Sequence, residues 1–335
     1  MIKQVNNNRY SKCSKSSSFL NSININKWNG RNYIVYISFI AIFCFFAVSL
    51  HEIGFLSLVN LLNILRQTAI ISVMSVAMTF VLASAEIDLS VGAVAGLSSV
   101  ITATVIMQYG IVAGITAALL TGFMIGLLNG FLVTKVGVPS FLVTLGMQGI
   151  ITGLAMWLTD MAAIPIINET FTFVFGSGNI GQMPVLFIWT IIILLIGHIG
   201  LKKTPYGRQV LATGGNEIAA RYSGVNTKKI KQITFIIMSV VASLGGMLYA
   251  GRLHSGRFQW GAGDELSVIA AVVLGGTSLF GGRASVLGTI TGALLVGLMN
   301  NGLILMGLEA SQIMIIRGAI IILAVASAGK KAVNN

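Results

Sequence analysis

Residues that could perform catalysis are few in this chain and lie far apart. The three histidines, His51, His198 and His254, fall in different parts of the sequence. No His-Glu-x-x-His or Gly-x-Ser-x-Gly segment is present to build a metal site or an activated serine, and no P-loop is present to cradle the phosphates of ATP. The two cysteines, Cys13 and Cys44, are not spaced for zinc or for a disulfide framework. We therefore expect no catalytic residue, no metal ion and no cofactor, and the chain is not predicted to be an enzyme.

Two ionisable residues, Asp88 and Arg317, interrupt long apolar stretches. A charge at the centre of a membrane helix costs about 2.5–3.5 kcal/mol on insertion scales, so such a residue usually pairs or faces water. Asp88 either flanks a polar pathway near its inner gate together with Ser90, or caps a helix that starts at Leu89. Arg317 either extends toward the membrane surface or pairs with a carboxylate such as Asp88 or Glu86.

A short capped helix is predicted within the basic loop that runs from Lys202 to Gln232. Asn216 suits the N-cap, Glu217 favours the first turn, and Gly224 suits the left-handed position after the last turn. Such a helix would present small and apolar side chains to solvent, namely Ile218, Ala219, Ala220 and Tyr222. The loop is then either an ordinary solvated connector or a knob that enters a groove in a partner protein.

Composition indicates how these residues are positioned. Hydrophobic residues make up 55 % of the 335 residues and charged residues only 9 %, against about 25 % charged in soluble domains. The mean hydropathy is +0.89. We therefore expect an all-α polytopic membrane protein. The net charge of +12 does not form a soluble basic face, so a nucleic-acid partner is not expected.

Apolar runs of about 20 residues, the length that crosses a bilayer, predict about ten membrane helices. They lie near residues 33–50, 68–85, 89–107, 111–133, 138–158, 184–201, 233–251, 266–281, 285–307 and 311–328. The expected organisation is a basic, disordered tail at 1–32, a membrane domain at 33–329 that contains the loop 202–232, and a short tail at 330–335. The N-terminal tail is expected to touch anionic membrane lipid.

The basic residues set the orientation. With a cytoplasmic N-terminus, ten crossings place every lysine on the cytoplasmic side, as the positive-inside rule requires. Both termini are then cytoplasmic. Arg252 and Arg257 are exceptions and fall in an outer loop, where they could pair with Asp264 and Glu265. The proposed outer segments also carry Asp160, Glu169 and Glu309.

A faint internal repeat links the two halves of the chain. Residues 88–91 are echoed by 264–268, and 118–130 are echoed by 293–302. The matched helices run in opposite directions in the predicted layout, which is the pattern of an inverted 5+5 repeat.

An ordered set of motifs resembles the ribose-type monosaccharide permeases of ABC importers, the group that includes ribose, xylose, galactose and autoinducer-2 importers. The segment 217–224 is similar to their ATPase-docking loop. The remaining matching stretches are 87–92, 137–146, 274–282 and 288–303. One departure is Ala85-Glu86, where many members of this group have small residues.

The resemblance implies a permease subunit of an ATP-driven importer in the bacterial inner membrane, with ribose or a related monosaccharide as the cargo. A second copy of the chain, a tandem-cassette ATPase that binds ATP and Mg²⁺, and a periplasmic sugar-binding protein are the implied partners. An ion-coupled secondary sugar transporter is the alternative, although few carboxylates or histidines are available for an ion relay. A non-transporting membrane scaffold is a third class that no residue supports.

The resemblance also distributes roles among residues. Residues expected to couple to the ATPase are Asn216, Glu217, Ala219, Ala220, Arg221 and Gly224. Those expected along the translocation pathway are Glu86, Asp88, Ser90, Gly92, Thr277 and Ser278. Arg252 and Arg257 are expected to dock the binding protein. Glycines that allow close helix packing around the pathway are Gly92, Gly96, Gly126, Gly130, Gly275 and Gly276.

Overall fold

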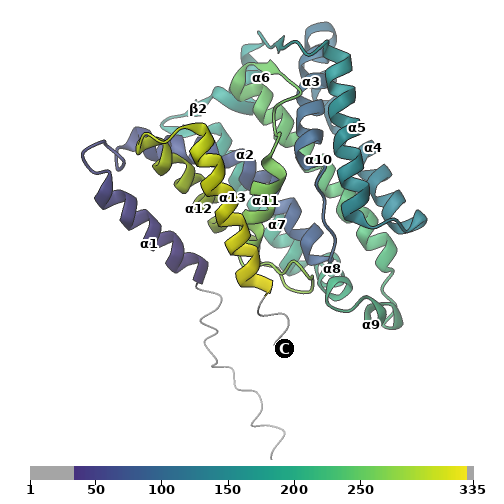
Figure 1. Ribbon diagram of the computed structural model, residues 1–335. Coiled ribbons are helices and arrows are strands. Elements are labelled where there is room, and N and C mark those ends of the chain that lie inside the picture. The colour runs from purple at the N-terminus through teal and green to yellow at the C-terminus, as the bar shows by residue number, and fades with distance from the viewer. Residues whose placement is uncertain (1–33, 330–335) are drawn as a thin grey trace, which may run out of the picture. The chain divides into compact units, whose positions relative to one another are not determined.

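The computed structural model describes the backbone of residues 34–329 and the side chains of 35–320 and 322 (Figure 1). The tails expected at 1–32 and 330–335 lie outside the described residues. The helices are α1 (Ile34–Ser49), α2 (Leu58–Ala83), α3 (Val91–Tyr109), α4 (Ile111–Phe131), η3 (Leu132–Val136), α5 (Ser140–Thr159), α6 (Glu169–Thr172), η4 (Phe173–Ser177), α7 (Val185–Lys203), α8 (Pro205–Gly215), α9 (Glu217–Tyr222), α10 (Thr227–Leu253), α11 (Asp264–Leu274), α12 (Val286–Leu305) and α13 (Ala310–Gly329).

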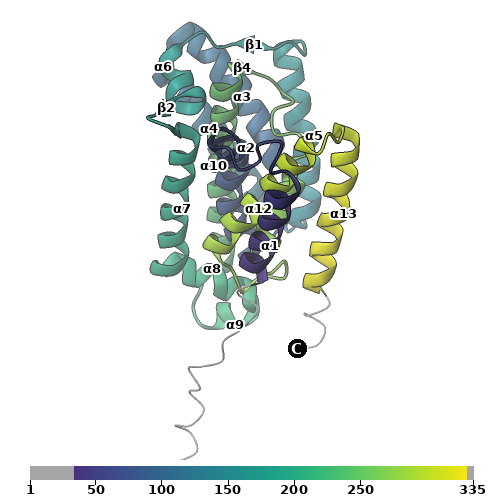
Figure 2. The ribbon, with the colours of Figure 1, turned by 90° about the vertical axis from the view of Figure 1, so that its left-hand side faces the viewer.

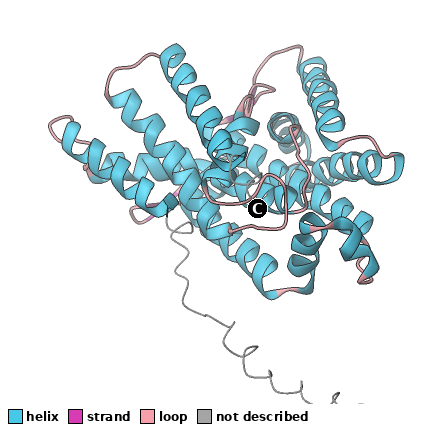
Figure 3. Cartoon of the chain, turned by 60° about the horizontal axis from the view of Figure 1, so that its bottom comes forward, coloured by secondary structure: helices cyan, strands magenta, loops and turns pink. Residues whose placement is uncertain are grey.

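Strands contribute little to the described structure, which is almost entirely helical (Figure 3). The antiparallel pair β1 (Ile164–Pro165) and β4 (Ser255–Gly256) joins the loop after α5 to the loop after α10. The second antiparallel pair, β2 (Asn179–Ile180) and β3 (Met183–Pro184), precedes α7. The prediction of an all-helical, polytopic membrane protein is confirmed.

Seven of the described helices are long and apolar enough to cross a membrane. They are Leu58–Ala83, Val91–Tyr109, Ile111–Val136, Ser140–Thr159, Val185–Lys203, Thr227–Leu253 and Val286–Leu305. The apolar stretches of α1 and α13 that could be assessed, Val35–Ser49 and Ala310–Ile320, are shorter than a full span. In α2, 83 % of the apolar window is buried, against 22 % in α5. Helix α2 therefore forms the interior, together with α3 and α10, and α5 presents most of its surface outward.

One end of the molecule carries the short helices α8 and α9, and we call it the α9 end. The opposite end carries α6, β1 and β4 (Figure 2). The start of α1 and the end of α13 both point toward the α9 end (Figures 1 and 2). This is the arrangement that an even number of crossings predicts for a chain whose two termini share a side with the basic loop.

The predicted helix at 266–281 is wrong in its extent. Helix α11 has only 11 residues, about half of what a span needs. It ends because Gly276 takes a left-handed backbone (φ +88°) and because Gly275 packs against the backbone of Gly288, where a β-carbon would lie 2.5 Å from the Gly288 carbonyl carbon. An apolar, glycine-rich run of span length in the sequence thus forms a helix of only about half that length in the structure.

A non-helical stretch precedes α11 and runs along α3. The hydroxyl of Ser99 accepts from the backbone N–H of Arg257 (3.1 Å) and donates to its carbonyl (3.0 Å). Farther along, the carbonyl of Phe258 would lie 2.5 Å from a β-carbon on Gly96. The carbonyl of Gly261 approaches Gly92, near the start of α3, in the same way. Helix α11 therefore begins beside the start of α3 and not in an outer loop.

Most of the glycines expected near the pathway serve close packing. A β-carbon on Gly126 would lie 2.6 Å from the α-carbon of Ile236, and one on Gly130 would lie 2.7 Å from the amide of Gln232, both on α10. These contacts let α4 and α10 approach closely, as small residues allow in membrane helices. Gly276 differs, because its positive φ serves a turn.

Candidate functional site

Helix α8 anchors the α9 end to the membrane helices. Thr204 caps α8 by accepting from the backbone N–H of Gly207 (3.1 Å), and Pro205 occupies the first turn. The ring of Tyr206 stacks on Phe80 with centroids 6.2 Å apart, and its hydroxyl lies 2.9 Å from that of Thr234. Burial raises the pKa of Tyr206 to about 12, so this hydroxyl stays protonated as a hydrogen-bonding group.

The predicted geometry of α9 is confirmed. The Asn216 side chain accepts from the backbone N–H of Ala219 (3.0 Å) and caps the first turn. Gly224 has φ +86°, and its N–H donates to the carbonyl of Arg221 (2.9 Å). The next N–H, from Val225, donates to the carbonyl of Ala220 (3.0 Å). A capped N-terminus and a glycine-terminated C-terminus therefore fix this short helix locally.

One face of α9 is apolar and free. Ile218 is 68 % exposed and Tyr222 is 91 % exposed. Ala219 is exposed between them, whereas Ala220 is buried against the body of the protein. The expectation that Ala220 is presented to solvent is therefore wrong, because its methyl group faces inward on a helix whose polar residues are anchored on that side. The free face consists of Ile218, Ala219 and Tyr222.

Glu217 points away from this free face and toward α10. Its carboxylate pairs with Arg221, accepts from the hydroxyl of Thr227 (3.2 Å), and lies 2.8 Å from Nζ of Lys231. Burial alone would raise the pKa of Glu217. The hydrogen bond and charge of Lys231, with the hydrogen bonds from Arg221 and Thr227, outweigh that effect and hold the pKa below its ordinary value. Glu217 is therefore a charged anchor for α9.

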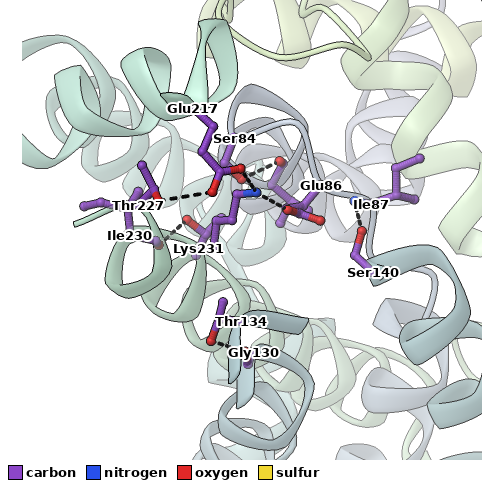
Figure 4. Close-up of polar contacts among 12 residues, drawn as sticks. Ser84, Glu86, Ile87, Gly130, Thr134, Ser140, Glu217, Thr227, Ile230 and Lys231 are labelled. Atoms are coloured by element: carbon purple, nitrogen blue, oxygen red, sulfur yellow. Dashed lines mark hydrogen bonds and ion pairs between the residues drawn. The ribbon is translucent and has the colours of Figure 1, made fainter. Parts of the chain in front are cut away.

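Lys231 also binds a carboxylate from a distant part of the chain. Its Nζ lies 2.6 Å from Oε1 of Glu86, in the non-helical segment between α2 and α3 (Figure 4). The side chains of Lys231 and Glu86 are only 15 % and 11 % exposed. Glu86, which was expected to line the pathway, takes part in this ion pair. The sequence did not predict this role of Lys231, because there Lys231 is only one of several cations in a basic loop.

Backbone contacts join the same segments. A β-carbon on Gly214, at the end of α8, would lie 1.9 Å from the carbonyl oxygen of Ala83, at the end of α2. The carbonyl of Ala83 also accepts from the N–H of Gly282 (3.0 Å). Gly281, with φ +81°, packs on the carbonyl of Gly214. The junction of α8 and α9 thus contacts both the segment before α3 and the loop after α11.

Asp88 and Ser90 form a buried turn at the start of α3. Oδ1 of Asp88 accepts from the backbone N–H (2.9 Å) and the hydroxyl (2.6 Å) of Ser90, and Nδ2 of Asn129 donates to the same hydroxyl (3.0 Å). Asp88 therefore satisfies the backbone before the helix, which begins at Val91 and not at Leu89 as expected. Its second oxygen, Oδ2, is buried without a hydrogen-bond partner among the described residues.

Thr277 and Ser278 serve the loop after α11. The hydroxyl of Thr277 accepts from the backbone N–H of Ser285 (3.3 Å). The hydroxyl of Ser278 accepts from the backbone N–H of Phe280 (3.2 Å). None of the hydrogen bonds of the described residues joins them to Asp88. The structure therefore does not bring the expected pathway residues together in one polar cluster.

Asp264 and Glu265 lie in the first turn of α11 and not in an outer loop, with Asp264 half-buried and Glu265 buried. Glu265 accepts from the amide of Gln148 (3.1 Å), is 9 % exposed, and its Oε2 would lie 2.7 Å from a β-carbon on Gly92. The hydroxyl of Tyr249 donates to Asp264. This placement follows because α11 begins beside the start of α3, after a non-helical stretch that looks like an outer loop in the sequence.

Arg252 and Arg257 are free of ion pairs within the part of the chain that the structure describes. Arg252 donates to the carbonyl of Arg66 (3.3 Å). The guanidinium of Arg257 is exposed and lies 5.7 Å from the ring centre of Trp260. Local pairing with Asp264 or Glu265 is therefore not observed.

Arg317 is half-buried on α13 and faces α11 and α12. It lines a small cavity with Ser267 and Asn300. Its Nε has no hydrogen-bond partner among the described residues. The expected partners are engaged elsewhere, because Glu86 binds Lys231 and Asp88 binds Ser90.

These features define a polytopic helical membrane protein that presents a short, firmly anchored helix with an apolar face at one end. The chain belongs to the transporter family described as "Branched-chain amino acid transport system / permease component", whose profile matches residues 60–325. It is thus an ABC transporter permease component and not itself a catalytic ATPase, which leaves the alternative of an ion-coupled carrier without support.

Several relatives are similar over most of the chain. The ribose import permease protein RbsC of Escherichia coli K12 is 39 % identical over 274 residues, covering 79 % of this chain and 84 % of the relative. RbsC of Bacillus subtilis 168 is 38 % identical over 269 residues, covering 79 % and 83 %. The L-arabinose ABC transporter permease protein AraH of Azospirillum brasilense is 36 % identical over 260 residues, covering 76 % of each. No solved structure matches the chain. The resemblance to ribose-type permeases is confirmed.

Proposed function

We propose that this chain is the permease subunit of an ATP-driven importer that carries a monosaccharide across the bacterial inner membrane. Family membership and the ribose and arabinose permeases among its relatives support this function. The observation that carries the proposal is the free apolar face of α9, since an ATP-driven permease without a phosphate-binding loop needs a contact with a separate ATPase.

The ATPase subunit docks on α9. Ile218 and Tyr222 expose apolar surface in water, and such surface on a rigid helix suits a groove in a partner. Asn216 and Gly224 define the ends of this helix, and Glu217 and Arg221 anchor it from behind. The residues that couple to the ATPase are therefore of two kinds. Those of the apolar face touch the ATPase, and the others hold that face in position.

The membrane domain makes ten crossings with both termini in the cytoplasm. The shared direction of the α1 and α13 ends supports this topology (Figure 2). Helices α3 and α11 each follow a non-helical stretch, and their starts lie together. This similarity supports an inverted repeat in which α3 and α11 are equivalent.

Two copies of the chain form the pathway, and a periplasmic sugar-binding protein delivers the cargo. The starts of α3 and α11 lie together, and we place the pathway beside the residues at this point, Asp88, Ser90 and Gly92. Thr277 and Ser278 lie in the loop toward its inner end. The unpaired Arg252 and Arg257 are available for carboxylates of the binding protein.

Uptake in proteoliposomes tests the function. The chain is reconstituted with its ATPase subunit and a binding protein, and labelled ribose, arabinose, xylose and galactose are compared. We expect uptake of one of these sugars only when ATP is present on the ATPase side. Uptake that follows a proton or sodium gradient without ATP would contradict the proposal.

A further inference from the structure

Lys231 is a single cation that holds two segments of different function. One carboxylate that it binds belongs to α9, through Glu217 at 2.8 Å, and the other belongs to the segment before α3, through Glu86 at 2.6 Å (Figure 4). Arg221 pairs with Glu217 from the other side. Two cations therefore balance two carboxylates, and the group needs no further ion.

Glu86 is followed directly by residues that contact two membrane helices, so a displacement of Glu86 would be passed to both. The next N–H, from Ile87, donates to the hydroxyl of Ser140 (3.2 Å), and the Ile87 carbonyl accepts from Thr144 (3.4 Å), both on α5. One residue later, Asp88 forms the turn that starts α3. The N–H of Glu86 itself donates to the carbonyl of Val81 in the last turn of α2 (3.1 Å), so the segment ties the end of α2 to α5 and to the start of α3.

The ion pair differs physically from the backbone contact beside it. Gly214 touches the carbonyl of Ala83, and such a steric contact resists compression but not separation. A hydrogen-bonded ion pair with little solvent exposure resists separation as well, because breaking it leaves a charge without its partner. The steric contact therefore transmits only movement of α9 toward the end of α2. The ion pair of Lys231 also transmits movement of α9 away from it.

We propose that Lys231 is a positioning residue that transmits the movement of α9 to the segment 84–90, and through it to α3 and α5. This inference rests on the proposed function, in which the ATPase moves α9. When α9 is drawn toward the closing ATPase, Glu86 follows it through Lys231, and the start of α3 shifts relative to α11.

The test measures ATP hydrolysis by the assembled complex in nanodiscs and takes the ratio of the rates with and without sugar-loaded binding protein. Glu86→Gln removes one arm of the connection and leaves the contact between Lys231 and Glu217. We expect this ratio to fall about fivefold or more, while the ATPase still co-purifies. Lys231→Met should show the same loss, and Lys231→Arg, which keeps the charge and both partners, should restore most of the ratio.

The matched control is Glu309→Gln, the same chemical change at an exposed position, and it should keep the wild-type ratio. Melting temperatures of all variants separate a lost connection from a lost fold. A Glu86→Gln protein that folds and keeps the wild-type ratio would overturn the inference. The proposed function fails separately, if the wild-type complex shows no stimulation or if a charge on the free face of α9 leaves stimulation intact.

Discussion

Gly214 of α8 lies so close to the carbonyl oxygen of Ala83 at the end of α2 that a β-carbon would come within 1.9 Å of it. The junction before α9 is therefore seated directly on the end of the most buried membrane helix. The same carbonyl binds the N–H of Gly282. Three segments that are far apart in the chain thus meet through backbone atoms, and pressure on the junction before α9 is passed to the other two.

Gly214→Ala should break this contact. Overpacking in a filled site costs about 1–3 kcal/mol, and here the obstacle is backbone, which yields less than a flexible side chain. We expect a lower melting temperature in detergent and a loss of sugar-stimulated ATP hydrolysis. Gly215→Ala is the matched control, since its nearest neighbour is the α-carbon of Gly282 at 3.6 Å, an ordinary contact. Equal stability of the two variants would show that the contact is unimportant.

Asp88→Asn separates the structural role of Asp88 from its role in transport. Asparagine keeps an oxygen at the position of Oδ1, so the turn with Ser90 should persist and the protein level should stay normal. We expect slower uptake, because the ionisable carboxyl group beside the pathway is lost. Asp88→Ala removes both hydrogen bonds, each worth about 0.5–1.5 kcal/mol, and should lower the protein level too. Normal uptake by Asp88→Asn would leave Asp88 with only a structural role in the turn before α3.

Glu217 makes the anchoring of α9 depend on pH in a defined direction. Its pKa lies below the ordinary value, which is about 4.3 for glutamate. The stabilisation is therefore complete above the ordinary pKa and is lost as the pH falls through the lower pKa of the folded protein. Hydrogen exchange across 217–222 should stay slow from pH 7 to about pH 5 and accelerate, after correction for intrinsic rates, only in stronger acid. Glu217→Gln should abolish this acid-dependent step, and an unchanged step in that variant would assign it to another group.

Arg252 and Arg257 should govern the affinity for the binding protein. The double change to glutamate replaces attraction by repulsion at the proposed docking surface. We expect about tenfold more binding protein to be needed for half-maximal stimulation at low salt, with a smaller difference at high salt because exposed charges are screened. Arg257→Lys keeps the charge and should behave nearly as the wild type. A double variant that titrates like the wild type would exclude both arginines from docking.

The features that the sequence predicted correctly depend on neighbouring residues. Asn216 and Gly224 determine the ends of α9 through local hydrogen bonds and a left-handed backbone, and both signals stand in the sequence itself. The long membrane helices were equally clear, because uninterrupted apolar runs of span length have few alternatives.

The features that it missed depend on contacts between distant segments. Nothing near Lys231 in the sequence indicates Glu86 as its partner, since the pairing requires the segment after α2 to lie beside the start of α10. The short α11 was hidden because Gly275 and Gly276 look like ordinary membrane glycines until Gly288 is placed against them. Asp264 and Glu265 were assigned to an outer loop because nothing in the sequence shows that the stretch before α11 runs along α3.

The most direct test of the central claim is sugar-stimulated ATP hydrolysis by the complex in nanodiscs, with the free face of α9 altered. Ile218 is 68 % exposed, so Ile218→Asp should leave the permease folded and place a charge where the ATPase docks. We predict that this variant loses both co-purification of the ATPase and stimulation by sugar, while Ile218→Val keeps them. A fully stimulated Ile218→Asp complex would contradict the assignment of α9 as the ATPase-docking helix.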